Sequence, residues 1–155
     1  MHGPVRGDNC SACHSIHGGD QEHLLQARFP AAQHAPFDPD AYALCFQCHE
    51  GDLVLVERTR TLTEFRDGDQ NLHYLHVQGE RKGRTCRACH VIHGGDQPRN
   101  MAEAVVLGDS EWLLPIGFEL EDGGGSCAPG CHEAMSYRRE KDAPDAEAPA
   151  QEDPP

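Results

Sequence analysis

One stretch of this chain occurs twice, and this repeat limits what the chain can fold into more than any other feature. Residues 10–20 read CSACHSIHGGD and residues 86–96 read CRACHVIHGGD, so nine of the eleven positions are identical. Each copy has two cysteines separated by two residues and followed at once by a histidine. At this spacing, two thiols can bond to the vinyl groups of a haem while the adjacent imidazole ligates its iron.

Two further cysteine pairs are also followed by histidine. CFQCH ends at His49, whereas CAPGCH, which ends at His132, has three residues between its cysteines. Pro129 and Gly130 could bulge this loop so that the same two vinyl groups are reached. The sequence therefore predicts four covalently bound c-type haems. The attachment cysteines are Cys10, Cys13, Cys45, Cys48, Cys86, Cys89, Cys127 and Cys131, and the proximal ligands are His14, His49, His90 and His132.

Zinc binding and disulfides are the other common uses of eight cysteines, in intracellular and exported proteins respectively. Neither explains why every pair is followed by histidine. Histidine makes up 11 of the 155 residues, so this would arise by chance in four of four cases with a probability on the order of 10⁻⁵. Haem attachment is therefore the favoured interpretation.

The composition also favours a fold built on cofactors. A hydrophobic content of 37% and an aromatic content of 6% are lean for a domain that buries a core of its own side chains. A haem is a large apolar plate, and four of them would replace much of that core. We expect mostly irregular chain with short α-helices wrapped around four c-type haems, and little or no β-structure.

The net charge of -13 makes nucleic acid and anionic membranes poor partners and suits cationic ones, although solubility alone would also explain it. No apolar run approaches 18 residues, so we expect no transmembrane helix. The N-terminus has no apolar signal-peptide region. Because haem is attached to CxxCH outside the cytoplasm, we nevertheless expect an exported protein that is periplasmic, outer-membrane-associated or extracellular.

Local patterns predict a few short elements. Asp20 is a plausible N-cap for a helix through QEHLLQARF, which would end at Pro30. Residues 53–66 are strand-like and fit a β-hairpin fragment or an extended linker equally well. His73 and His76 would share one side of a helical turn.

Further short helices are expected from Pro98 through NMAEAVVL and over HEAMSYRREK. Trp112 is the aromatic residue expected to lie against a haem. The stretch EDGGGSC is expected to be a flexible approach to the fourth site.

The chain divides into two similar halves and a tail. Residues 1–66 and residues 67–141 each contain two haem sites, which indicates a tandem duplication packed as one four-haem domain. Neither half is expected to be stable without haem. Residues 142–155 are rich in proline, alanine and acidic residues, and we expect them to be disordered.

Seven histidines remain as candidates for distal ligands, of which four are needed if each iron has two imidazoles. They are His2, His17, His23, His34, His73, His76 and His93. The repeat makes His17 equivalent to His93, and His2 roughly equivalent to His76. It offers no counterpart for His23 and His34, which we expect at the surface or beside a ligand. His73 competes with His2, which lies at a chain end that can fray.

His17 and His93 follow a proximal histidine by only three residues. They lie on the same side of that haem as the proximal ligand, so each should reach a different haem. We expect this to be the second haem of its own half. Two imidazoles on each iron would leave no open position, which is typical of haems that only exchange electrons.

The chain resembles the doubled-CxxCH family of multihaem cytochromes at HGPVRGDNCSACHSIHGG, at the following leucine pair and at ALCFQCHE. Residues 64–93 and 123–132 are also similar to segments of large exported multihaem cytochromes of metal-reducing bacteria. The resemblance covers roughly residues 2–140. It implies bis-histidine haems, little regular structure and electron transfer. In such relatives both histidines of an NLHxxH segment are commonly ligands, which favours His73 alongside His76 and implies that His2 ligates an outer haem or is displaced.

Three functions follow as hypotheses. The first is an electron-transfer protein, not an enzyme, whose partners are other cytochromes, other redox proteins or an extracellular metal oxide. The second is a reductase of a small oxyanion, which needs one haem with an open position, and the unusual fourth site is the candidate. The third is a homo-oligomer or filament in which a distal histidine is donated between chains.

Overall fold

The computed structural model of the chain describes residues 1–79, 83–106 and 110–140. Within these ranges the helices are α1 (Gly3–Arg6), α2 (Asp52–Leu55) and α3 (Leu72–Val77). Short 3₁₀ turns cover Cys10–Ala12, Glu22–Leu24, Pro39–Tyr42, Cys45–Gln47, Cys86–Ala88 and Pro98–Asn100. The strands are β1 (Arg66–Asp67), β2 (Gln70–Asn71), β3 (Ala104–Val106), β4 (Leu113–Pro115), β5 (Phe118–Glu121), β6 (Gly124–Cys127) and β7 (Met135–Arg138).

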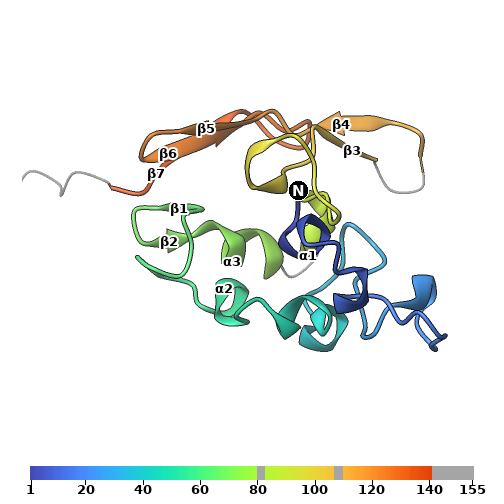
Figure 1. The fold of residues 1–155 in the computed structure, drawn as a ribbon. Helices are drawn as coiled ribbons and strands as arrows, with labels where there is room; N and C mark the ends of the chain where they lie inside the picture. Colours follow the sequence, from blue (N-terminus) through green and yellow to red (C-terminus); the bar gives the residue numbers. More distant parts are fainter. Residues whose placement is uncertain (80–82, 107–109, 141–155) are drawn as a thin grey trace, which may run out of the picture.

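The strands form three small antiparallel sheets. They are β1–β2, β3–β4 and β5–β6–β7. Figure 1 shows β3 to β7 along one side of the molecule, with α3 and α1 beneath them and α2 on the far side of these helices. The expected fold of mostly irregular chain with short helices and little sheet is confirmed.

The three-stranded sheet corrects two local expectations. EDGGGSC is not a flexible approach, because Gly124 and Gly125 lie in the central strand β6. A Cβ at Gly125 would lie 2.7 Å from the Tyr137 hydroxyl. The helix expected over HEAMSYRREK is wrong, since β7 pairs with β6 in the register Gly125 to Tyr137. Because glycine has no side chain, the Tyr137 ring can pack directly on the sheet. Tertiary packing therefore makes this segment a strand and not a helix.

The helices expected after Asp20 and from Pro98 are also wrong, and the reason is the same in both places. His23 and Leu24 have φ of 57° and 55°, and Arg99 and Asn100 have 58° and 55°. These left-handed residues end each 3₁₀ turn and fold the chain back on its own CxxCH segment. Ala104–Val106 of the NMAEAVVL segment then form strand β3 instead of a helix.

The returning segments make matching hydrogen bonds in the two copies. In the first copy, Ser15 N donates to Leu24 O (2.7 Å) and Gln26 N to Cys13 O (2.9 Å). In the second, Val91 N donates to Asn100 O (2.9 Å) and Ala102 N to Cys89 O (2.8 Å). The two copies of the repeated stretch therefore fold alike.

Residues 53–66 form neither a complete β-hairpin nor an extended linker. They begin inside α2 and reach β1 only at Arg66, which pairs with Asn71 in a two-residue hairpin. The expectation that His73 and His76 share a helical turn is confirmed by α3. The disorder expected for residues 142–155 lies outside the described residues.

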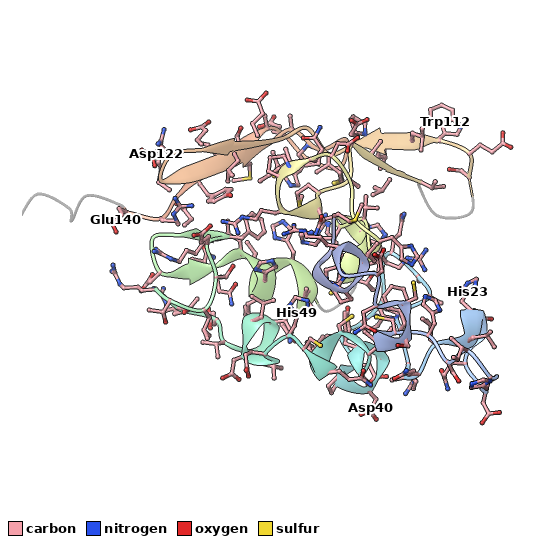
Figure 2. All side chains as sticks on the ribbon, in the orientation of Figure 1. His23, Asp40, His49, Trp112, Asp122 and Glu140 are labelled. Carbon is pink, nitrogen blue, oxygen red and sulfur yellow. The ribbon has the colours of Figure 1, made fainter. Side chains whose placement is uncertain are left out.

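The protein core is small, as the composition indicates. Its main cluster is Tyr42, Val54 and Val77, packed by Phe37, Ala41, Phe46, Leu53 and Cys86. Trp112 is 76% exposed and lies at the outer edge of the β3–β4 hairpin (Figure 2).

Candidate functional site

Three of the four attachment sequences adopt the same turn. Each CxxC opens a 3₁₀ turn at its first cysteine, over Cys10–Ala12, Cys45–Gln47 and Cys86–Ala88. The following histidine donates its backbone N–H to the carbonyl of that cysteine, at 3.0 Å in the first two turns and 2.9 Å in the third. All eight cysteines are free thiols. Each turn therefore holds two thiols and an imidazole together, as covalent haem attachment requires.

The fourth site is held differently. Cys127 ends β6, and the loop to Cys131 is fixed by hydrogen bonds from Ala128 N to Gly117 O and from Gly130 N to Pro115 O, both 3.1 Å. The extra residue is thus accommodated by docking on the β4–β5 connection. Cys131 and His132 are exposed.

Main-chain carbonyls orient the proximal imidazoles. Nδ1 of His14 donates to the carbonyl of His23 (2.9 Å), and Nδ1 of His90 donates to that of Arg99 (3.1 Å). Nδ1 of His132 donates to the Glu133 carbonyl (2.6 Å). A histidine ligand commonly donates its second ring nitrogen in this way, which fixes the tautomer and leaves Nε2 for the metal. The carbonyls of His23 and Arg99 each lie nine residues after the proximal histidine that they orient. This equal spacing is the signal by which the sequence could have indicated them.

Two pairs of imidazoles face each other. The ring centres of His14 and His93 are 6.1 Å apart with 17° between their planes. Those of His2 and His49 are also 6.1 Å apart, with 6° between planes. A metal ion that accepts a nitrogen from each of two opposed imidazoles, with bonds of about 2 Å, holds the ring centres about 6 Å apart. These residues fit a bis-histidine haem.

The structure therefore brings His93 to the first site of the other half. The expectation from sequence was an approach to His132, in its own half. His2 lies beside His49 in spite of its place near the chain end. His49 lies toward the middle of the molecule, whereas His23 is at its outer edge (Figure 2).

Helix α3 presents the other two candidate ligands. Nδ1 of His76 donates to the Leu72 carbonyl (2.7 Å), and His73 Nδ1 shares a hydrogen bond with Thr63 Oγ1 (3.0 Å). The Phe65 ring packs edge-on against His73 and parallel to His76. Sequence reasoning missed Thr63 and Phe65, which no motif marks.

Burial lowers the pKa of both of these imidazoles. It lowers the pKa of His73 to about 4, with nearby His90 and His76 adding to the effect. It also lowers the pKa of His76, where Arg84 and His132 act in the same direction. A neutral imidazole is the form that ligates a metal. His73 thus lies near the third proximal histidine, and His76 near the fourth.

Thiols of successive sites lie close together. Burial raises the pKa of Cys13, with Cys48 and Cys45 adding to it, and raises that of Cys89 to about 11, with Cys127 and Cys131 contributing. A hydrogen bond between the Cys45 and Cys86 thiols lowers the pKa of Cys45 and raises that of Cys86. The first site therefore neighbours the second, the second the third, and the third the fourth.

The remaining three candidate histidines lie at the surface of the molecule. His17 is exposed and makes no hydrogen bond or ring contact with the described residues. His23 and His34 are also exposed, as expected for surface residues. In the described ranges, no group of three or more His, Cys, Asp or Glu side chains could hold a metal ion by itself.

Known proteins match parts of the chain. The family described as the doubled CXXCH motif matches residues 2–53. The C-type polyheme cytochrome OmcB of Geobacter sulfurreducens is 35% identical over 82 residues, in each of two strains. This match covers 53% of this chain but only 9% of the relative's length.

No solved structure matches the chain. In the part of the chain that the structure describes, no helix is both long and apolar enough to cross a membrane. The CxxCH motifs and the sequence matches together indicate covalently bound haem c.

Proposed function

We propose that this chain, a doubled-CXXCH multihaem c-type cytochrome, binds four haems and carries electrons along them. The observation that carries this proposal is the pair of opposed imidazoles 6.1 Å apart at both sites of the first half. The ligand pairs we infer are His14 with His93, His49 with His2, His90 with His73, and His132 with His76. Each bound haem would supply a reversible one-electron couple.

The protein itself would fix the distances between neighbouring haems and the environment of each haem. The neighbouring thiols support a linear order in which each site adjoins the next along the sequence. The second and third sites meet at Cys45 and Cys86. Electrons would therefore pass there from a haem of the first half, residues 1–66, to a haem of the second, residues 67–141. Backbone hydrogen bonds between the halves, such as Ala35 N to Gly83 O (2.9 Å), support one four-haem domain.

The location and partners of the protein can be inferred from the chemistry of haem attachment and from its charge. Haem is attached to CxxCH outside the cytoplasm, so we infer an exported protein in the periplasm, at the outer membrane or outside the cell. Its partners would be other cytochromes or redox proteins, or an extracellular metal oxide. The net charge of -13 favours docking on cationic surfaces.

The test is the intact mass of the exported, purified protein, together with its electron paramagnetic resonance spectrum. We expect four covalent haems and only low-spin iron, because two imidazoles on each iron give a strong ligand field. The double variant Cys127→Ala/Cys131→Ala should carry three haems. Three haems in the unaltered chain would contradict the assignment of the fourth site.

A second candidate function is reduction of a small oxyanion at the fourth site. It is favoured by the exposure of Cys131 and His132 and by a loop that lacks the shared turn. It requires one iron with an open position. A high-spin signal that His132→Ala removes would support the reductase, and uniformly low-spin iron would exclude it.

A further inference from the structure

One tyrosine hydroxyl in the protein core has no hydrogen-bond partner. Tyr42 is 1% exposed, and its hydroxyl makes no hydrogen bond with the described residues. Its ring packs against those of Phe37 and Phe46, with ring centres 5.4 Å and 5.8 Å away. Phenylalanine would make the same ring contacts without the cost of burying an unsatisfied polar group. The Tyr42 hydroxyl therefore fits a hydrogen-bond acceptor that the chain itself does not supply.

This hydroxyl lies at the junction of the second and third attachment sites. Tyr42 ends the 3₁₀ turn Pro39–Tyr42, three residues before Cys45, and Cys86 packs against the core cluster that contains it. The thiols of Cys45 and Cys86 hydrogen-bond to each other. Burial raises the pKa of Tyr42 to about 12, with Cys86 and Cys45 adding to the effect. The hydroxyl therefore keeps its proton at neutral pH and lies near both sulfurs.

Haem attachment changes what these two sulfurs can do. On the proposed function, Cys45 holds the second haem and Cys86 holds the third. A thiol that bonds to a haem vinyl group becomes a thioether, which has no S–H to donate but still accepts a hydrogen bond weakly through its sulfur. The hydrogen bond between Cys45 and Cys86 would then be lost, leaving two acceptors without a donor. The hydroxyl of Tyr42 is a donor without an acceptor, so the two needs match.

We propose that the Tyr42 hydroxyl donates a hydrogen bond to a thioether sulfur of the second or third haem and raises the reduction potentials of both haems. The inference rests on the proposed function, since it assigns a role at two of the proposed haem sites. The partial positive charge of the hydroxyl hydrogen would lie at the edge of both haems and stabilise the electron that each accepts. Burial strengthens this effect, because the local dielectric constant is low. Electrons would thus be favoured on the two haems that join the halves.

The first test is a redox titration of the haem-loaded protein, followed by visible absorption. Tyr42→Phe keeps the ring and its contacts with Phe37 and Phe46 and removes only the hydroxyl. We expect the reduction equilibria of two of the four haems to shift by about threefold toward the oxidised form, which is about 30 mV for a one-electron couple. Unchanged potentials in Tyr42→Phe would overturn the proposal.

Tyr74→Phe is the matched control. Tyr74 lies on α3 and is partly exposed, so water can hydrogen-bond to its hydroxyl. We expect this variant to keep all four potentials. An equal shift in both variants, or an equal shift of all four haems in Tyr42→Phe, would indicate a general change in the fold and would overturn the proposal.

Resonance Raman spectra detect the hydrogen bond to sulfur directly. The C–S stretching bands of the thioethers should shift when the haem-loaded protein is equilibrated in D₂O, because the hydroxyl proton of Tyr42 exchanges for deuterium. The same bands in Tyr42→Phe should not respond to D₂O. Thioether bands that are insensitive to D₂O in the unaltered protein would overturn the proposal, and this measurement does not depend on any variant.

Intact mass and electron paramagnetic resonance of the same samples separate this inference from the proposed function. A missing fourth haem would contradict the proposed function but would leave the expected shifts at the second and third haems unchanged. Four low-spin haems whose potentials do not respond to Tyr42→Phe would contradict the role of Tyr42 alone.

Discussion

At the scale of single residues, two of the proximal imidazoles are oriented by main-chain carbonyls that a strained backbone directs at them. His23 and Arg99 have positive φ, which costs a non-glycine residue on the order of 1 kcal/mol or more. Their carbonyls accept the Nδ1–H of His14 and His90. The hydrogen bonds and the ordered ligand offset the strain. Nε2 of each ring is thereby left for the iron.

A substitution at Gly94 tests whether His2 ligates the iron of the second site. Gly94→Ala and Gly18→Ala both add a Cβ at strongly positive φ, so they share the same backbone strain. Only at Gly94 would the Cβ collide with the His2 backbone. We expect Gly94→Ala to detach His2 from the second haem, giving a high-spin signal, and Gly18→Ala to leave the protein low-spin. Matching spectra for the two variants would contradict the ligation by His2.

At the scale of elements, one asparagine joins the two central helices. Asn71 is fully buried. Its side-chain oxygen accepts the backbone N–H groups of His73 (3.0 Å) and Tyr74 (3.4 Å), which caps α3. Its amide donates to the carbonyls of Leu53 (2.9 Å) and Val56 (2.8 Å) at the end of α2. The position of both histidines of α3 therefore depends on Asn71.

Replacing Asn71 should loosen this pair of helices. Asn71→Ala removes the helix cap and leaves two partly buried carbonyls without the amide donor, for a loss of about 3 kcal/mol in the free energy of unfolding. Asn71→Ser retains an oxygen for the cap, and its loss should be smaller. Denaturant unfolding of the haem-loaded protein measures both. If the two variants are equally stable, the cap does not contribute.

The elements also show where sequence reasoning succeeds and fails. The CxxCH turns and α3 were predictable, because their signals are local in the chain. The helix expected after Asp20 was wrong, because hydrogen bonds back to Cys13 and Ser15 override the helix propensity of that segment. The partner of His93 could not be predicted, since it depends on how the two halves pack.

At the scale of the whole molecule, the halves are joined by a short seam beside the third haem site. Thr85 is 2% exposed. Its hydroxyl donates to the carbonyls of Ala32 (2.8 Å) and Gln33 (3.2 Å), and the Arg87 guanidinium donates to Ala31 (2.7 Å). This seam lies next to Cys86, whose thiol meets that of Cys45. The contact between halves and the proposed electron path therefore coincide.

Thr85→Val tests the seam with almost no change of shape. It removes the buried hydroxyl and should cost about 1–2 kcal/mol of the free energy of unfolding. Thr61→Val is the matched control at an exposed position and should change stability by less than about 0.5 kcal/mol. Thermal unfolding of the haem-loaded variants gives the comparison. Equal stability of the two variants would show that the hydroxyl does not hold the halves together.

The opposed rings of His14 and His93 belong to residues far apart in the chain. On the proposed ligation, each such pair becomes a cross-link, and the chain between its ends becomes a closed loop. A disulfide that closes a loop of ~80 residues is worth about 4 kcal/mol through the unfolded state. A coordinate bond restrains the chain in the same way. Unlike a disulfide, it can be broken by a competing ligand and forms again when that ligand is removed. Added imidazole should therefore relax the packing of the two halves reversibly while every thioether stays intact.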